Sequence, residues 1–304
     1  MSAASMHQAP GAPVNQAPVE PRANQAMTQA MTQAWDQAAD GWDANAERVR
    51  AWLHEASAAM LDAARLRPGA RVLDVAAGAG DQTLDIAHRV GPTGEVLATD
   101  IAGRMVALAQ ARVQAAGLTQ VRTRAADAQA LGLAGACFDA AICRLGLMFC
   151  AAPRLALAEM HAALAPGGRV SVLVFSHAAR NPCIAMLMQT ARRHAGLPPA
   201  DPQEAGGLLS LGAPGLLARL LAEAGFVDVE VQALDAPFRL PSSDDYVDFV
   251  QRAGSPAIEL LRGLPAGAQQ AAWDDIHRQL ALFDTPGGWA GPNELLLGSA
   301  TRPG

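Results

Sequence analysis

The chain contains no lysine, so all 23 of its basic residues are arginine. Without lysine there is no Schiff base to a carbonyl substrate or to pyridoxal phosphate, no P-loop lysine and no lysine general base. Aromatic residues make up only 4% of the chain, and the four cysteines follow neither zinc-ligand nor CxxC spacing. We therefore expect no bound metal, and we expect reduced thiols in a cytoplasmic protein.

The sequence also lacks an excess of positive charge. Its net charge is −6 and its isoelectric point is about 5.6, so no broad basic face is available for a nucleic-acid backbone. An export signal and an apolar run of membrane-spanning length are missing as well. Since 51% of the 304 residues are apolar, we expect a globular protein that neither binds nucleic acid nor spans a membrane.

The organisation of the chain follows from changes in pattern. Residues 1–25 are rich in Ala, Pro, Gln and Asn, which predicts a disordered tail, and residues 26–66 predict helices. From Arg71 onward, short apolar runs alternate with amphipathic helices, as in a parallel sheet covered on both faces. Strands are predicted at 71–75, 95–99, 121–125, 139–143, 169–175 and 227–233, with a last strand within 291–302. Helices are predicted at 82–89, 103–116, 153–164, 182–195 and 213–224.

These patterns predict the α/β class. We expect a doubly wound, Rossmann-like, seven-stranded and mostly parallel sheet with helices on both faces. Its core spans 67–235, and a helical cap over 236–290 is inserted before the last strand. A helical insertion at this point would lie over the sheet and could close on a ligand.

The most informative segment is the loop after the first predicted strand. The strand runs into a series of very small residues and then a helix, which leaves backbone N–H groups open to a ligand. Asp74, Ala76, Gly78 and Gly80 alternate through it. A dinucleotide fingerprint G-x-G-x-x-G starting at Gly78 would need glycine where Thr83 stands, which disfavours a dehydrogenase.

An acidic residue ends the second predicted strand. Asp100 lies twenty positions after Gly80, where a carboxylate can accept hydrogen bonds from two adjacent ribose hydroxyls. The sequence therefore predicts a nucleotide-type site at the carboxyl ends of these strands.

Five motifs in order resemble the class I S-adenosylmethionine-dependent methyltransferases, most closely the ubiquinone/menaquinone C-methyltransferase-like branch. They are the loop after the first strand, the stretch 100–105 that resembles D-x-S-x-x-M, the Asp-Ala step at 127–128, the fourth strand at 138–143 and the L-x-P-G-G turn at 164–168. Alanine replaces a usual glycine at Ala76 and a usual serine at Ala102. The resemblance implies that S-adenosylmethionine is the cofactor and that 26–304 is a class I methyltransferase domain. It implies cofactor contacts from Asp74, Ala76, Gly78, Gly80, Asp100, Ile101, Met105, Asp127, Ala128 and Arg144.

Two residues are candidates for the chemistry. His177 follows the fifth predicted strand at the ligand edge of the sheet, where an imidazole could remove a proton from the acceptor or serve as a simple loop residue. Arg144 could pair with an acidic acceptor or cap the neighbouring helix. Trp42, Tyr246 and Trp289 could wall an apolar acceptor site or belong to the core.

The sequence thus predicts methyl transfer to a partly apolar small molecule, with carbon, nitrogen or oxygen as the methylated atom. Two alternatives stay open: an NAD(P)-dependent oxidoreductase on the same fold, and a protein that binds S-adenosylmethionine without transferring its methyl group. A homodimer is compatible with the sequence.

Overall fold

The structure is a computed structural model that describes residues 21–133, 135, 138–199, 201, 204–253 and 255–304. Most of the tail predicted over 1–25 therefore lies outside the described residues, as does Cys137. Helix α1 (Pro21–Ala44) begins at Pro21, so the prediction of disorder is wrong for residues 21–25. The described cysteines, Cys143, Cys150 and Cys183, are free thiols.

The centre of the molecule is a seven-stranded sheet in the order β3-β2-β1-β4-β5-β10-β6. Its strands are β1 (Arg71–Val75), β2 (Glu95–Asp100), β3 (Val121–Ala125), β4 (Phe138–Arg144), β5 (Leu164–Phe175), β6 (Val227–Asp235) and β10 (Glu294–Thr301). The ladders that join β1 to β5 are parallel, whereas β10 runs antiparallel to both β5 and β6. The predicted mostly parallel, seven-stranded sheet is confirmed.

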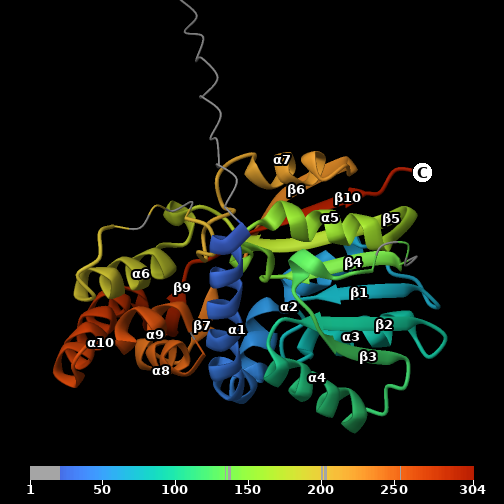
Figure 1. The fold of residues 1–304 in the computed structure, drawn as a ribbon. Helices are drawn as coiled ribbons and strands as arrows, with labels where there is room; N and C mark the ends of the chain where they lie inside the picture. The colour runs from blue at the N-terminus through green and yellow to red at the C-terminus, as the bar shows by residue number, and fades with distance from the viewer. Residues whose placement is uncertain (1–20, 134, 136–137, 200, 202–203, 254) are drawn as a thin grey trace, which may run out of the picture.

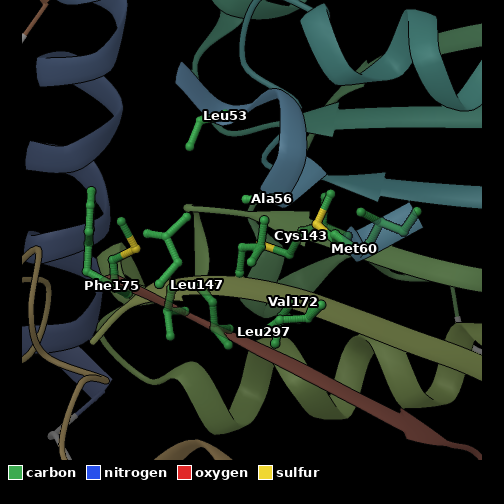
Figure 2. Close-up of a cluster of buried hydrophobic side chains, with 14 of the residues drawn as sticks. Leu53, Ala56, Met60, Cys143, Leu147, Val172, Phe175 and Leu297 are labelled. Atoms are coloured by element: carbon green, nitrogen blue, oxygen red, sulfur yellow. The ribbon is translucent and has the colours of Figure 1, made fainter. Parts of the chain in front are cut away.

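Helices cover both faces of this sheet (Figure 1). One layer contains α2 (Ala46–Ala63), α3 (Asp81–Val90) and α4 (Gly103–Ala115), and the other contains α5 (Pro153–Ala163) and α7 (Leu216–Glu223). Figure 2 shows the core where α2 meets the sheet: Leu53, Ala56 and Met60 of the helix lie over Val172 of β5 and Leu297 of β10. Each of these five side chains is at least 96% buried. Among the described residues, short 3-10 turns link the elements: η1 (Ala128–Ala130), η2 (Leu147–Phe149), η3 (Ala178–Arg180) and η4 (Ala281–Phe283).

A second group of elements forms the cap. It contains β7 (Phe238–Leu240), α8 (Ser243–Ala253), α9 (Ser255–Arg262), α10 (Ala266–Leu280), β8 (Asp284–Thr285) and β9 (Gly288–Gly291), and α6 (Pro182–His194) packs against its helices. Three short strands form a small sheet in the order β7-β9-β8, which the expectation of a mostly helical cap over 236–290 did not include. Strands of two to four residues are too short to display a period in sequence.

Helix α1 stands between the cap and the main sheet (Figure 1). It contacts α8 and α9 on one side and α4 on the other. Ion pairs from Arg104 to Asp40 and from Arg112 to Asp43 tie it to α4. None of the helices in the described part of the chain has the length and apolar character needed to cross a bilayer.

Candidate active site

The loop between β1 and α3 is held in a left-handed backbone conformation. The φ angles of Ala76, Gly78 and Gly80 are 54°, 56° and 85°. A Cβ added at Gly80 would lie 2.9 Å from the Cα of Ala109, so glycine at this position lets α3 and α4 approach closely. Gly80 does not line the pocket described below, and its role is in packing.

Asp74 lies beneath this loop and is completely buried. Its carboxylate accepts a hydrogen bond from Thr83 Oγ1 at 2.7 Å and another from Gln82 Nε2. Burial raises the pKa of Asp74 to about 7, although the hydrogen bonds from Thr83 and Gln82 oppose the shift. Asp74 thus anchors the first turn of α3 to β1 and does not face the pocket, which corrects the expectation that it contacts the cofactor directly.

Asp100 joins the loop to the end of β2. Its Oδ2 accepts a hydrogen bond from the backbone N–H of Gly78 at 2.9 Å, and its Oδ1 accepts one from Ala102 at 2.9 Å. Burial raises the pKa of Asp100, against these backbone bonds. The backbone of Ile101 also hydrogen-bonds to this carboxylate. A carboxylate offers about four acceptor positions, so at least one remains for a ligand's hydroxyl group.

These elements border one pocket, a cavity of about 210 Å³ at the carboxyl ends of the strands. The predicted residues that line it are Ala76, Gly78, Asp100, Ile101, Met105, Asp127, Ala128 and Arg144. Asp127 also caps η1 by accepting a hydrogen bond from the backbone N–H of Gln129 at 2.9 Å. The structure therefore brings together eight residues that the sequence predicted as one site, from the β1–α3 loop, the end of β2 and the residue after it, α4, the start of η1 with the residue before it, and β4.

His177 does not belong to this group. Its side chain is exposed, and it is absent from the pocket lining. Its backbone carbonyl accepts hydrogen bonds from Arg180 and Asn181, as in an ordinary connection before a short turn. The expectation that His177 acts as a base on the acceptor is therefore not supported by its position.

Arg144 is fixed at the edge of the pocket. Its Nη1 donates to Ser57 Oγ at 2.8 Å, and its Nη2 lies 3.0 Å from Asp81 Oδ2. Asp81 is the first residue of α3 and also pairs with Arg50. With only 9% of its side chain exposed, Arg144 links β4 to α2 and α3 and still presents one side to the cavity. Both predicted roles, helix partner and pocket residue, fit this position.

The remaining wall of the pocket is apolar, and it comes mainly from helices together with Phe175 at the end of β5. It is lined by Met31, Trp35, Trp42, Trp52, Leu53, Met148, Phe149, Phe175, Ile184, Leu187, Met188, Leu208, Tyr246, Phe249, Val250, Ala253 and Ala257. Trp42 and Tyr246 thus reach the cavity as the sequence suggested, but Trp289 stacks behind Tyr246 at a ring separation of 4.4 Å. Apart from Trp42, the contribution of α1 was not predicted from the sequence, and neither were those of α2 and α6, because amphipathic patterns show which face of a helix is buried and not what it faces.

Comparisons with known proteins point in one direction. The model of the ubiE/COQ5 methyltransferase family matches residues 34–191, slightly more than half of the chain. The ubiquinone/menaquinone biosynthesis C-methyltransferase UbiE of Bordetella parapertussis is 38% identical over 143 residues, which are 47% of this chain and 55% of that protein. UbiE of Burkholderia mallei is 40% identical over 139 residues, 45% of this chain and 57% of that protein. The match thus spans little more than half the length of these curated relatives.

Solved structures share the fold at low identity. Haemonchus contortus phosphoethanolamine N-methyltransferase 2, solved with phosphomonomethylethanolamine and S-adenosylhomocysteine, aligns with a TM-score of 0.55 at 15% identity, over 88% of this chain and 61% of that one. The cyclase SpnF aligns with a TM-score of 0.53 at 17% identity, over 88% of this chain and 97% of that one. Because proteins with such different names share it, the fold alone does not determine the reaction.

Proposed function

Since the chain belongs to the ubiE/COQ5 methyltransferase family, we propose that it transfers a methyl group from S-adenosylmethionine to a small-molecule acceptor. The observation that supports this most directly is the position of Asp100. Its carboxylate ends β2, lines the pocket and is held by the glycine-containing loop after β1. A carboxylate in this place suits the paired hydroxyls of a ribose.

The other residues on the sheet side fit the same cofactor. The backbone around Gly78 is open, since the nearest atom to a Cβ added there is Trp42 Nε1 at 3.7 Å. Ile101 and Met105 supply apolar surface for a purine ring, and Asp127 supplies a carboxylate for its polar edge. The guanidinium of Arg144 suits a ligand carboxylate.

When bound, S-adenosylmethionine supplies an electrophilic methyl group on a sulfonium. The protein's contribution is alignment and the exclusion of water. The sheet side would hold the cofactor, whereas the apolar wall would orient the acceptor, and well-oriented reactants gain on the order of 7–11 kcal/mol over encounter in solution. A general base is worth only about 10²–10⁴-fold, so a pocket without histidine in its lining remains competent.

The apolar wall also defines the acceptor in coarse terms. Most of the pocket lining is aliphatic or aromatic, and the charged residues of the pocket lie on the sheet side. The acceptor we infer is therefore a small, partly apolar molecule. A cytoplasmic location and a homodimer remain predictions from the sequence.

Calorimetric titration with S-adenosylhomocysteine tests the proposal. We expect micromolar or tighter binding to the unmodified protein, and a large loss in Asp100→Ala, since each hydrogen bond to a charged acceptor is worth about 1.5–3 kcal/mol. A loss of about 1.4 kcal/mol in binding free energy corresponds to a tenfold weaker affinity. Asp62→Ala is the matched control, because Asp62 is 70% exposed and pairs with Arg89 away from the pocket.

Thermal unfolding of both variants shows whether each is folded. If the unmodified protein does not bind, the methyltransferase proposal fails and NAD(P)H becomes the next titrant. If it binds and Asp100→Ala binds equally well, Asp100 is not in the site. Methyl transfer to any acceptor in a subsequent screen would separate an enzyme from a protein that only binds the cofactor.

A further inference from the structure

The chain's only tyrosine lies in the apolar wall of the pocket. Tyr246 of α8 is 5% exposed, and its ring stacks on Trp289 and meets the edge of Phe238 at 5.7 Å. Within the described residues, no hydrogen bond to its hydroxyl is present, and that oxygen is not among the polar atoms sealed in the interior without a partner. The hydroxyl is therefore left to the cavity that the residue lines.

A phenylalanine would fill the same aromatic cluster without this hydroxyl. Phe238 and Phe249 pack around Tyr246 at ring separations of 5.7 and 6.3 Å. The aromatic contacts use only the ring of Tyr246, so packing alone does not account for its hydroxyl group. A ligand that accepts a hydrogen bond would.

The aromatic contacts place this hydroxyl away from the cofactor side. Trp42 Nε1 lies beside Gly78. The ring of Phe249 lies 6.2 Å from the ring of Trp42, and the ring of Tyr246 lies 6.3 Å from the ring of Phe249. Val250 and Ala253, on the following turns of α8, add only apolar surface. Tyr246 thus offers a hydroxyl within an apolar compartment, separated from the glycine loop by two aromatic rings.

We propose that Tyr246 donates a hydrogen bond to a carbonyl or phenolic oxygen of an uncharged, largely apolar acceptor and so sets the acceptor's orientation. This inference rests on the proposed function, because it assigns the apolar compartment to the methyl acceptor. An ionic group placed there would lose its hydration without gaining a charged partner. Burial raises the pKa of Tyr246, which keeps its phenol protonated as a donor at neutral pH.

The test uses two probes that differ by one oxygen, 2-acetylnaphthalene and 2-ethylnaphthalene. Their binding is measured by equilibrium dialysis against the unmodified protein and Tyr246→Phe, with and without saturating S-adenosylhomocysteine. Tyr246→Phe keeps the ring and its stacking. We expect it to weaken binding of the ketone roughly threefold to tenfold, the range of one neutral hydrogen bond, and to leave the hydrocarbon unchanged.

Phe249→Leu is the matched control, because it removes aromatic surface from the same wall and should weaken both probes alike. Equal weakening of both probes by Tyr246→Phe, no weakening of the ketone, or no binding of either probe to the unmodified protein would each overturn the inference. The arm without S-adenosylhomocysteine keeps the two proposals apart. If the cofactor product does not bind, the methyltransferase proposal fails, whereas the ketone preference of the compartment is still measured.

Discussion

Replacing Gly146 with alanine should damage the pocket through a contact with one identifiable atom. Gly146 follows β4, and its φ of −106° is acceptable to alanine. A Cβ at this position would lie 2.3 Å from the Cβ of Ala76 and 3.1 Å from Cys143 Sγ. Real Cβ atoms essentially never approach another heavy atom within 3.0 Å, so the backbone must shift.

The expected loss follows from this overlap. Overpacking a close-packed site costs about 1–3 kcal/mol, and we expect Gly146→Ala to lower the free energy of unfolding by about 2 kcal/mol. Ala76→Gly removes the methyl group that causes the overlap and also relieves the positive φ of 54° at that residue, a strain of about 1–2 kcal/mol for an L-residue. In that background the closest contacts of the added Cβ are 3.1 Å to Cys143 Sγ and 3.7 Å to the Cα of residue 76. The two substitutions should therefore couple by about 1 kcal/mol or more.

Urea denaturation of the four proteins in this double-mutant cycle measures the coupling. Titration with S-adenosylhomocysteine adds a second readout, because both residues line the pocket. We expect Gly146→Ala to weaken binding and Ala76→Gly to restore part of it. If Gly146→Ala is as stable as the unmodified protein, or if the two effects simply add, the inferred complementarity of Ala76 and Gly146 is incorrect.

Two further predictions concern the β1–α3 region. Gly80→Ala should lose about 2–3 kcal/mol of stability in thermal or urea denaturation, since it combines positive φ with a clash against Ala109. Gly215→Ala is the matched control, because Gly215 precedes α7 in the same left-handed conformation but has no atom within 4 Å of the added Cβ; it should lose less, and equal losses would exclude the clash. Because the folded-state pKa of Asp74 is raised to about 7, its stability contribution is largest below pH 4 and declines as pH rises toward 7. The stability difference between the unmodified protein and Asp74→Asn should therefore fall from pH 4 to pH 7, and a constant difference would contradict the buried, protonated carboxyl.

The sheet could be predicted closely because its signals are local. Strands β1 and β3 match the predicted ranges 71–75 and 121–125 residue for residue. A short apolar run bounded by turn residues marks β1, whereas β3 alternates valine, threonine and alanine with arginine. Strand β5 begins at Leu164 and not at residue 169, because its first residues pair with Phe138 before an irregularity in the ladder. Glycine and proline in that segment favour a turn in sequence, whereas tertiary pairing extends the strand.

The site was predictable in location but not in side-chain direction. The rule that ligands bind at the carboxyl ends of parallel strands places Asp74, Asp100 and His177 at one edge of the sheet. It does not say that Asp74 points beneath α3 or that His177 faces solvent. The apolar wall was harder to predict, because Trp35 of α1 and Tyr246 of α8 are brought to the same pocket only by the tertiary fold.

The pairing of β6 with β10 has a consequence for how acceptor preference can change. Asp235 and Glu294 are register partners on adjacent antiparallel strands, so the 58 residues between them leave and rejoin the sheet at neighbouring points. A cap of different length or sequence could be exchanged there without altering the register of any strand. A two-residue hairpin turn can join such neighbours. In chimaera design, the part of the apolar wall that α8 and α9 supply could therefore be replaced while the β1–α3 loop and Asp100 are kept; that part consists of Tyr246, Phe249, Val250, Ala253 and Ala257.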